Sequence, residues 1–315
     1  MKLLLLALLA LPVGVQAQAF PEQPVRLVVP FAAGGLADIT MRNLGERMTP
    51  LLGKQVLVEN MPGAGGVTAA LAVKKARPDG HTLLVIANGT AIAKSLFKEL
   101  PYDPQADFAP VSLVTFFDLL VMVNPARYAT LQDLVAAAKA NPGKLNFATI
   151  NPGSTQNLSA LLFKSVAGID ATVVPFRTSP DAAAAVISGD ADAVFESYTA
   201  MKGLLAGGRL KPLASTAAKS FGYLPGVPTA EEAGVRGYVV TGWNALAAPA
   251  GTPPDRIALL NRHVNTVIAQ PDFRAKLLEA GTLAQAGPPE DLRRQLADDI
   301  AKWREVIRKA GIPQQ

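Results

Sequence analysis

Cysteine is absent from this 315-residue sequence, and histidine occurs only twice, as His81 and His263. A fold without cysteine cannot use disulfides, so its stability must come from its core. Thiol nucleophiles and Cys/His metal ligands are excluded as well, and neither histidine lies near a nucleophile and a carboxylate in the sequence. The glycines at positions 63, 65 and 66 do not have the spacing of a nucleotide-binding loop. We therefore expect no enzyme, no catalytic residue, no metal site and no cofactor.

Charged residues are few: they make up 17% of the chain, against 50% apolar residues, which argues against disorder. The formal net charge is +5, and the basic residues are scattered rather than arranged in a stripe with aromatic residues. We therefore expect no nucleic-acid partner, although a mildly positive surface attracts small anions weakly. The length exceeds the usual size of one domain and predicts two.

Only one long apolar run occurs, at residues 3–15, directly after Met1 and Lys2. The run is too short to cross a bilayer as a helix, and small residues follow it up to Ala17 and Ala19. A positive charge, an apolar run and small residues in this order are typical of a secretory signal peptide. We assign residues 1–19 to this signal, with cleavage near Ala17 or Ala19, and expect an exported, soluble protein.

Strands and helices alternate after the signal. The sequence predicts buried strands at 25–29, 56–58 and 82–87, each followed by a glycine-rich or polar loop and then a helix. This order is typical of a parallel sheet with helices on both faces. A second block repeats the pattern, with predicted strands at 119–123, 145–149, 172–175, 193–195 and 209–215.

The chain is expected to cross between two domains twice. A first domain of residues 20–118 and 217–315 is interrupted by a second domain of residues 119–216. Two crossings make a two-stranded hinge and a cleft, and open α/β sheets bind ligands outside the carboxyl ends of their strands. The predicted fold class is α/β, with a mixed, mostly parallel sheet flanked by helices in each domain.

The notable loops lie after strands and before helices. In the first domain, the pair Gly34 and Gly35 permits a tight turn and the close approach of another molecule. The N-terminus of the following helix supplies free N–H donors and a partial positive charge, which favour an anion. A plain connection between strand and helix is the alternative. The candidate ligand-binding residues of this domain are Phe31, Ala33, Gly34, Gly35, Asp38, Asn88, Gly89, Thr90 and Phe117.

The second domain contributes three such loops. Serine and threonine at these helix starts have two interpretations, ordinary capping or contact with a bound anion, and both can hold at once. Asp38 is expected to cap its helix and brace the glycine loop. Phe31 and Phe117 wall a pocket or belong to the core, and Arg177 pairs with an anionic ligand or is an ordinary surface arginine. The candidates from the second domain are Ser154, Thr155, Asn157, Arg177, Thr178, Ser179 and Glu196.

Several sequence blocks together resemble one family, the extracytoplasmic solute receptors of the tripartite tricarboxylate transporters, often called Bug-type receptors or TctC. The similarity runs from just after the signal to the C-terminus. Its blocks, in order, are 24–31 (PVRLVVPF), 58–66 (VENMPGAGG), 78–84 (PDGHTLL), 100–104 (LPYDP), 141–146 (NPGKLN), 224–229 (LPGVPT) and 248–253 (APAGTP).

This resemblance implies a periplasmic binding protein of the Venus-flytrap kind, similar to type II, that closes on a small carboxylate or amino-acid-like ligand. Such receptors reside in the periplasm and hand the ligand to a membrane permease of one large and one small subunit, which is their only link to the membrane. We expect a monomer. In the family, backbone N–H groups, hydroxyls and bridging water hold most ligand carboxylates.

Two stretches depart from the family pattern. Phe176-Arg177-Thr178 stands where relatives often have Tyr, Lys or Arg and then Gly, and Glu196-Ser197 stands where relatives often have Asp-Asn. A glutamate facing the cleft would repel a second ligand carboxylate unless it is protonated or paired with an amine or with Arg177. This argues against a simple dicarboxylate ligand.

Two other functions remain open from the sequence. One is a ligand-sensing module that signals to a membrane sensor kinase. The other is an exported hydrolase, which would need a nucleophile and a base brought together across the cleft.

Overall fold

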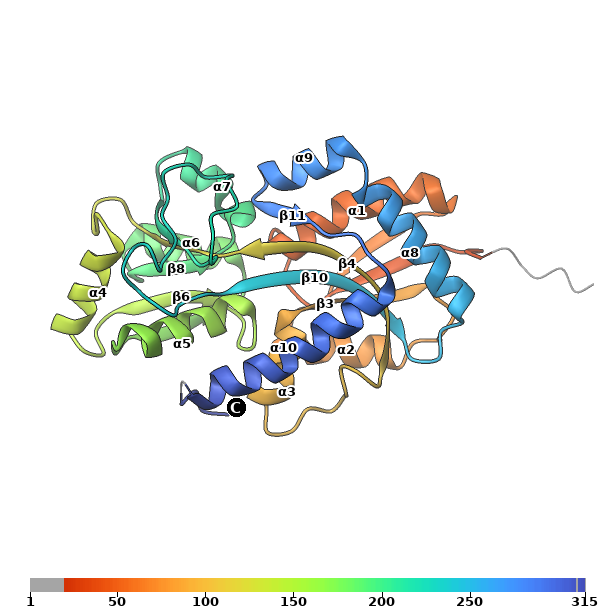
Figure 1. Cartoon of the computed structure of the whole chain (residues 1–315), viewed down its shortest axis with the longest axis horizontal. Coiled ribbons are helices and arrows are strands. Elements are labelled where there is room, and N and C mark those ends of the chain that lie inside the picture. The colour runs from red at the N-terminus through yellow and green to blue at the C-terminus, as the bar shows by residue number, and fades with distance from the viewer. Residues whose placement is uncertain (1–19, 310, 315) are drawn as a thin grey trace, which may run out of the picture.

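The computed structural model describes residues 20–309 and 311–314, so the predicted signal peptide lies outside the described residues. Two β-sheets with flanking helices form two lobes of the molecule (Figure 1). The predicted α/β fold with two mixed sheets is confirmed. Among the described residues, no helix has both the length and the apolar character to cross a membrane.

The first sheet has six strands in the order β11-β4-β10-β3-β1-β2. Strands β1, β2 and β3 are parallel, whereas β10 runs antiparallel to both β3 and β4, and β11 runs antiparallel to β4. The bounds are β1 (Val25–Val29), β2 (Val56–Asn60), β3 (Thr82–Ala87), β4 (Phe108–Asp118), β10 (Thr241–Pro249) and β11 (Thr282–Ala284).

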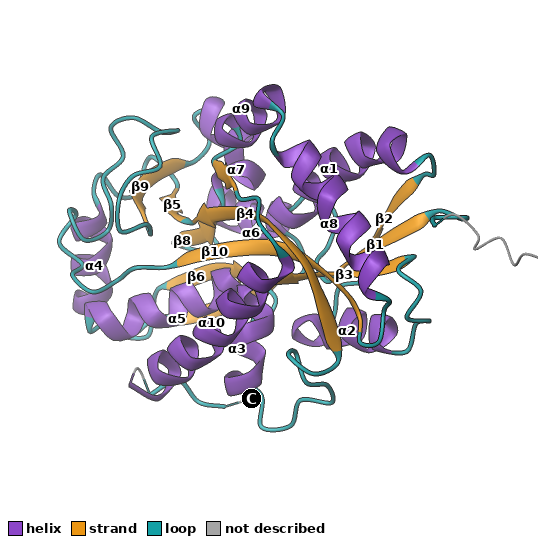
Figure 2. Cartoon of the chain, turned by 45° about the vertical axis from the view of Figure 1, so that its right-hand side comes forward, coloured by secondary structure: helices purple, strands orange, loops and turns teal. Residues whose placement is uncertain are grey.

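Helices cover both faces of the first sheet (Figure 2). Buried side chains of β1 alternate between two apolar clusters, with Leu27 and Val29 in one and Val28 in the other. This alternation is the pattern of a strand that is buried on both faces. The helices are α1 (Leu36–Leu52), α2 (Val67–Lys74) after a short 3-10 helix (Ala64–Gly66), α3 (Asn88–Leu96), α8 (Pro254–Ile268), α9 (Pro271–Glu279) and α10 (Pro289–Lys309).

The second sheet has five strands in the order β7-β6-β8-β5-β9. Strand β6 is parallel to β7 and β8, and β5 is antiparallel to β8 and β9. The strands are β5 (Leu120–Val123), β6 (Asn146–Ile150), β7 (Thr172–Phe176), β8 (Ala193–Glu196) and β9 (Lys211–Ser215). The helices are α4 (Leu131–Ala140), α5 (Thr155–Ala167), α6 (Ser179–Ser188) and α7 (Tyr198–Ala206).

The chain crosses between the sheets where β4 ends and β5 begins, and again between β9 and β10. The two crossings are bonded to each other. The Thr216 N–H donates to the carbonyl of Leu119 at 2.8 Å, and the Val240 N–H donates to the carbonyl of Thr216 at 2.8 Å. This pair of crossing segments is the predicted two-stranded hinge.

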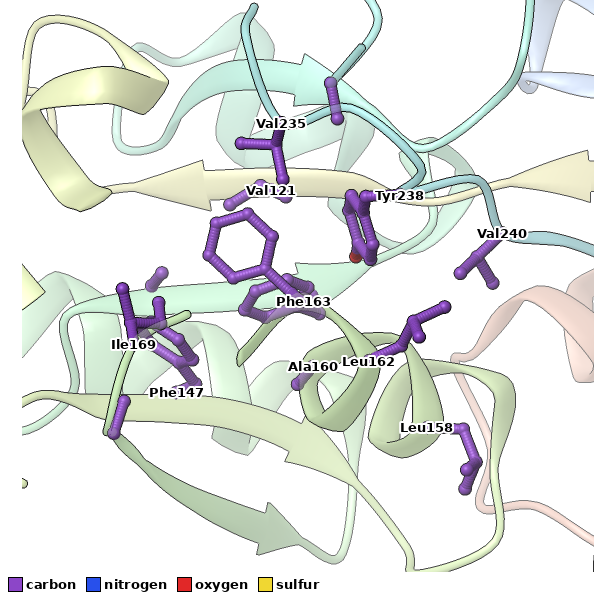
Figure 3. Close-up of a cluster of buried hydrophobic side chains, with 14 of the residues drawn as sticks. Val121, Phe147, Leu158, Ala160, Leu162, Phe163, Ile169, Val235, Tyr238 and Val240 are labelled. Atoms are coloured by element: carbon purple, nitrogen blue, oxygen red, sulfur yellow. The ribbon is translucent and has the colours of Figure 1, made fainter. Parts of the chain in front are cut away.

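The segment after β9 packs differently from expectation. Residues 217–240 were assigned to the first domain, yet Val235, Tyr238 and Val240 lie in the apolar core of the second sheet (Figure 3). The ring of Tyr238 meets that of Phe163 in α5 with 5.1 Å between centroids. This packing favours a second domain boundary near Val240.

Helix α10 spans both lobes. Its apolar stripe places Leu292 and Ile300 in a core cluster of the first sheet, and Trp303 and Ile307 in the core cluster of the second. Its C-terminal half runs beside α3 and reaches toward α5 (Figure 1). This apolar stripe therefore joins the cores of the two lobes.

Candidate functional site

A cavity lies between the two lobes, at the carboxyl ends of strands from both sheets. The space between its lining atoms is about 470 Å³, open solvent at its mouth included. It is lined from the first lobe and the crossing strands by Phe31, Ala32, Gly35, Leu36, Ala37, Ala87, Phe117 and Asn244, and from the second lobe by Ile150, Asn151, Thr155, Gln156, Arg177, Thr178 and Ser179.

Three helix N-termini meet at this cavity. Gly35, Ser154 and Thr178 are the N-cap residues of α1, α5 and α6, and residues within the first turn of each helix line the cavity. The caps are local: Ser154 Oγ accepts the Asn157 N–H, and Thr178 Oγ1 accepts the Asp181 N–H, both at 3.1 Å. The first N–H groups of each helix have no intrahelical acceptor, and the helix dipoles add partial positive charge. The arrangement suits an anion.

Arg177 adds a full positive charge to the cavity. It follows β7 directly and its side chain is exposed. No carboxylate of the described residues forms an ion pair with it, so its guanidinium is available to a carboxylate in bidentate geometry.

Apolar side chains complete the wall. Phe31, Leu36, Phe117 and Ile150 line the cavity beside the polar helix ends. Phe117 and Leu36 also pack together with Leu119 at the start of the hinge. A ligand that fits this lining therefore has an anionic end and an apolar part.

Asp38 braces the first glycine loop from behind the cavity. Its carboxylate accepts the Gly34 N–H at 2.9 Å and the Asn60 amide at 3.0 Å, and it forms an ion pair with Arg42 at 2.9 Å. Burial by itself raises the pKa of Asp38, but the hydrogen bonds from Arg42, Gly34 and Asn60, together with the Arg42 charge, outweigh it and leave the pKa below its ordinary value. Gly34 has φ +85°, which explains the glycine there. The expectation that Asp38 caps the helix is wrong: the N-cap is Gly35, because α1 starts at Leu36 and Asp38 lies within its first turn.

Glu196 is buried at the end of β8, only 1% exposed, and is held by three donors. Gln156 Nε2 donates to Oε1 at 2.8 Å, the Ser197 N–H donates to the same oxygen at 2.6 Å, and Ser179 Oγ donates to Oε2 at 2.7 Å. The Glu196 side chain does not line the cavity, although Gln156 and Ser179 do. Glu196 was expected to face a ligand carboxylate or to pair with Arg177. Instead, its side chain lies beneath Gln156 and Ser179 and supports these two lining residues.

The lobes touch beside the cavity. The hydroxyl of Thr155 donates to Asn88 Oδ1, and a Cβ placed on Gly89 would lie 2.9 Å from the carbonyl oxygen of Gly153. Gly89 and Gly153 also line a second, smaller cavity, which shares Phe31 and Asn151 with the first. These close contacts describe a closed arrangement of the two lobes.

The comparisons with known proteins agree with this geometry. The family model described as tripartite tricarboxylate transporter family receptor, TctC, matches residues 40–312. The chain belongs to this family. The receptor is 33% identical to the protein BugT of Bordetella pertussis over 300 residues, which cover 94% of this chain and 92% of BugT.

Two solved structures from Rhodopseudomonas palustris are similar to this receptor throughout. Rpa4515 with adipate has a TM-score of 0.90 and 32% identity, covering 93% of this chain and 99% of that one. MatC with bound malate has a TM-score of 0.87 and 35% identity, covering 91% of this chain and 100% of that one. The resemblance that the sequence motifs indicated is confirmed.

The receptor places the predicted site residues in three groups. Those that line the main cavity are Phe31, Gly35, Phe117, Thr155, Arg177, Thr178 and Ser179. Those that line the second cavity are Gly89, Thr90 and Ser154. Those that line neither of these two cavities are Ala33, Gly34, Asp38, Asn88, Asn157 and Glu196.

Sequence reasoning missed several lining residues. Asn244 lies inside β10, and only its pairing with Ala87 brings it to the cavity. Gln156 sits one position after a predicted contact, Thr155, so a helix-start signal could have included it. Asn151 lies in the loop after β6, three residues before the candidate Ser154, and its amide could have been included like that of Asn88.

Proposed function

We propose that this chain is a periplasmic receptor that binds a small carboxylate between its two domains and delivers it to a tripartite tricarboxylate transporter permease. The observation that carries the proposal is the meeting of three helix N-termini and the unpaired Arg177 at one cavity. Two relatives of similar fold have adipate and malate in their structures, which supports a carboxylate ligand. The receptor acts as a monomer, and its signal at residues 1–19 directs export.

The mechanism follows from the contacts between the lobes. A carboxylate that enters the open cleft meets the N–H groups at the starts of α5 and α6 and the guanidinium of Arg177. Closure brings the start of α1, with Gly35 and Leu36, onto the other side of the ligand. Because binding removes these donors from water only when both lobes are in place, the ligand stabilises the closed state.

A thermal-shift screen tests the proposal. The mature chain is unfolded and refolded to release any ligand carried through purification, and mono-, di- and tricarboxylates are then added. An acid at about 100 times its Kd should add roughly 2.7 kcal/mol of stability, which corresponds to several degrees in Tm. The absence of any shift across the panel contradicts a carboxylate receptor.

Arg177→Ala sharpens this test. Loss of a charged hydrogen-bond partner costs about 1.5–3 kcal/mol, so the Kd for the best acid should rise about 10- to 100-fold in calorimetry. Arg236→Ala is the matched control, because Arg236 is exposed and does not line the cavity. Equal effects of the two substitutions would remove Arg177 from the site.

Delivery to the permease is tested by uptake of the labelled acid. Cells that lack the receptor gene should take up less acid than the same cells after the gene is restored.

A further inference from the structure

The buried Glu196 fixes the hydrogen-bond direction of two cavity residues. Its oxygens accept from Gln156 Nε2, from Ser179 Oγ and from the Ser197 N–H. A carboxylate oxygen only accepts, so Gln156 must turn its NH₂ group and Ser179 its hydroxyl hydrogen toward Glu196.

Gln156 and Ser179 then present hydrogen-bond acceptors, and no donors, to the cavity. With its amide nitrogen bound to Glu196, Gln156 has its carbonyl oxygen Oε1 free, and Ser179 Oγ has only lone pairs left. No described residue donates a hydrogen bond to either oxygen. A ligand without a donor here would leave both acceptors unpaired on closure, which disfavours it strongly.

The negative charge of Glu196 also favours a hydrogen-bond donor in the ligand at this place. No Lys, Arg or His of the described residues forms an ion pair with Glu196, which lies beneath these two side chains. The positive groups lie close by, because Gln156 and Ser179 stand in the first turns of α5 and α6, and Arg177 directly precedes the α6 cap Thr178. The cavity is therefore dipolar, with sites for a carboxylate and, next to Gln156 and Ser179, for a hydrogen-bond donor.

We infer that the ligand is a carboxylate that carries a hydrogen-bond donor near its acid group, a hydroxyl or an ammonium, received by Gln156 Oε1 and Ser179 Oγ. Glu196 is a positioning residue that makes these two side chains accept. The inference rests on the proposed carboxylate function and narrows it to hydroxy or amino acids.

Matched acids that differ only in one substituent test the inference. One set is propionate, lactate and alanine; a second is succinate, malate and aspartate; a third is glutarate, 2-hydroxyglutarate and glutamate. In at least one set, the hydroxy or the amino acid should bind at least about tenfold more tightly than the unsubstituted acid by calorimetry. Whichever of the two binds more tightly identifies the donor.

Three outcomes overturn the inference. Unsubstituted acids that bind as tightly as their hydroxy and amino partners overturn it while the carboxylate function stands. If no acid of these three sets binds but other acids of the wider panel do, the inference is likewise overturned and the carboxylate function stands. Binding by no acid at all overturns the proposed function and this inference together.

The Glu196→Gln variant tests whether Glu196 orients Gln156 and Ser179 toward the ligand or only stabilises the fold. The glutamine can donate, so Gln156 and Ser179 are free to turn donors toward the cavity, and the preference for substituted acids should fall to within about threefold. Glu46→Gln, at an exposed position, should leave the preference unchanged. A ratio between two ligands is read on the folded fraction, so lower stability alone does not move it. An unchanged ratio overturns the role of Glu196.

If Glu196→Gln does not fold, Gln156→Met tests the same point from the cavity side. Methionine keeps the length of the side chain and removes the acceptor oxygen, so the ratio should again fall toward one. A ratio that stays at its original value in this variant overturns the inference.

Discussion

The hinge and the cavity both lie between the two lobes, but they differ in how their polar groups find hydrogen-bond partners. At the hinge, Thr216 Oγ1 accepts the Leu119 N–H at 2.9 Å and donates to the carbonyl of Val240 at 2.6 Å. Nearby, Ser215 and Tyr223 both donate to the buried Asp118 at 2.5 Å. Beside the cavity, in contrast, the buried Nδ2 of Asn88 has no partner among the described residues, and the first turns of α1, α5 and α6 include N–H groups that have no acceptor within their helix.

This difference follows from what each region does. The hinge is never exposed to a ligand, so its buried donors and acceptors must be paired within the chain. The cavity must release and recapture a ligand, so its donors are left for that ligand. The crossing segments thus pair their buried polar groups within the chain, whereas donors beside the cavity stay available to a ligand.

The largest expected effect is at the hinge, with Thr216→Val. Valine has nearly the same shape but leaves the Leu119 N–H and the Val240 carbonyl buried and unpaired. Each unpaired group costs about 1–3 kcal/mol, so the free energy of unfolding should fall by roughly 2–6 kcal/mol in urea denaturation. Thr266→Val, at an exposed position of α8, should change it by less than about 0.5 kcal/mol. Equal losses in the two variants would contradict a special role for the hinge bonds.

The next effect is at the cavity, with Gly89→Ala. The added Cβ would lie 2.9 Å from the Gly153 carbonyl oxygen of the other lobe, so the closed state is strained. Overpacking of this kind costs about 1–3 kcal/mol, and the Kd for the acid with the largest thermal shift should rise about tenfold or more.

The stability of the ligand-free chain should not fall in the same variant. Gly89 lies in α3, where alanine is a better helix former by up to about 1 kcal/mol, and the open state has no clash. Gly203→Ala in α7 is the matched control, because its Cβ would meet nothing within 4 Å. An unchanged Kd in Gly89→Ala would show that closure does not bring these two glycines together.

The sequence predicted most of the fold because local signals agreed with the tertiary arrangement. Strands β1 and β3 were expected at 25–29 and 82–87, and they span Val25–Val29 and Thr82–Ala87. Strand β11 was missed because three residues are too few to show a period, and α7 was missed because it starts at once after the cap Ser197.

Long-range packing explains the other errors. Residues 217–240 contain no periodic element, so nothing local shows that Tyr238 packs on Phe163 in the second lobe. The site was predicted to the level of its loops, since parallel strands put their carboxyl ends together. The orientation of the Glu196 side chain depends on its neighbour Ser197 and on two donors from distant parts of the chain, Gln156 and Ser179, and sequence order does not reveal such a network.

A smaller effect concerns pH and Asp118 at the hinge. Burial raises the pKa of its carboxyl above the ordinary 3.8, although the hydrogen bonds from Ser215 and Tyr223 lower it in part. The ordinary pKa applies to the unfolded chain and the raised pKa to the folded chain. As pH rises from the first to the second, the unfolded chain therefore loses the Asp118 proton before the folded chain does. The free energy of unfolding therefore falls over that window, by about 1.4 kcal/mol for each unit of pKa difference, and is unaffected by this group below it.

Asp118→Asn removes this titration. The difference in unfolding free energy, receptor minus variant, should decrease as urea denaturation is repeated from acid to neutral pH. Asp255→Asn, at an exposed position of α8, is the control and should show no such trend. A constant difference for Asp118→Asn would mean that the hinge carboxyl keeps its ordinary pKa.

The smallest effect is expected from an exposed ion pair that joins the two lobes. Lys202 in α7 and Glu279 in α9 lie 2.7 Å apart, and both side chains are exposed. Such pairs contribute little, so Lys202→Gln should change the Kd by less than about threefold at physiological salt, as should the control Lys219→Gln. At low salt the Lys202 variant alone should weaken binding further, because screening falls. A larger change at physiological salt would mean that surface charge, and not the groups that meet the ligand, holds the two lobes closed.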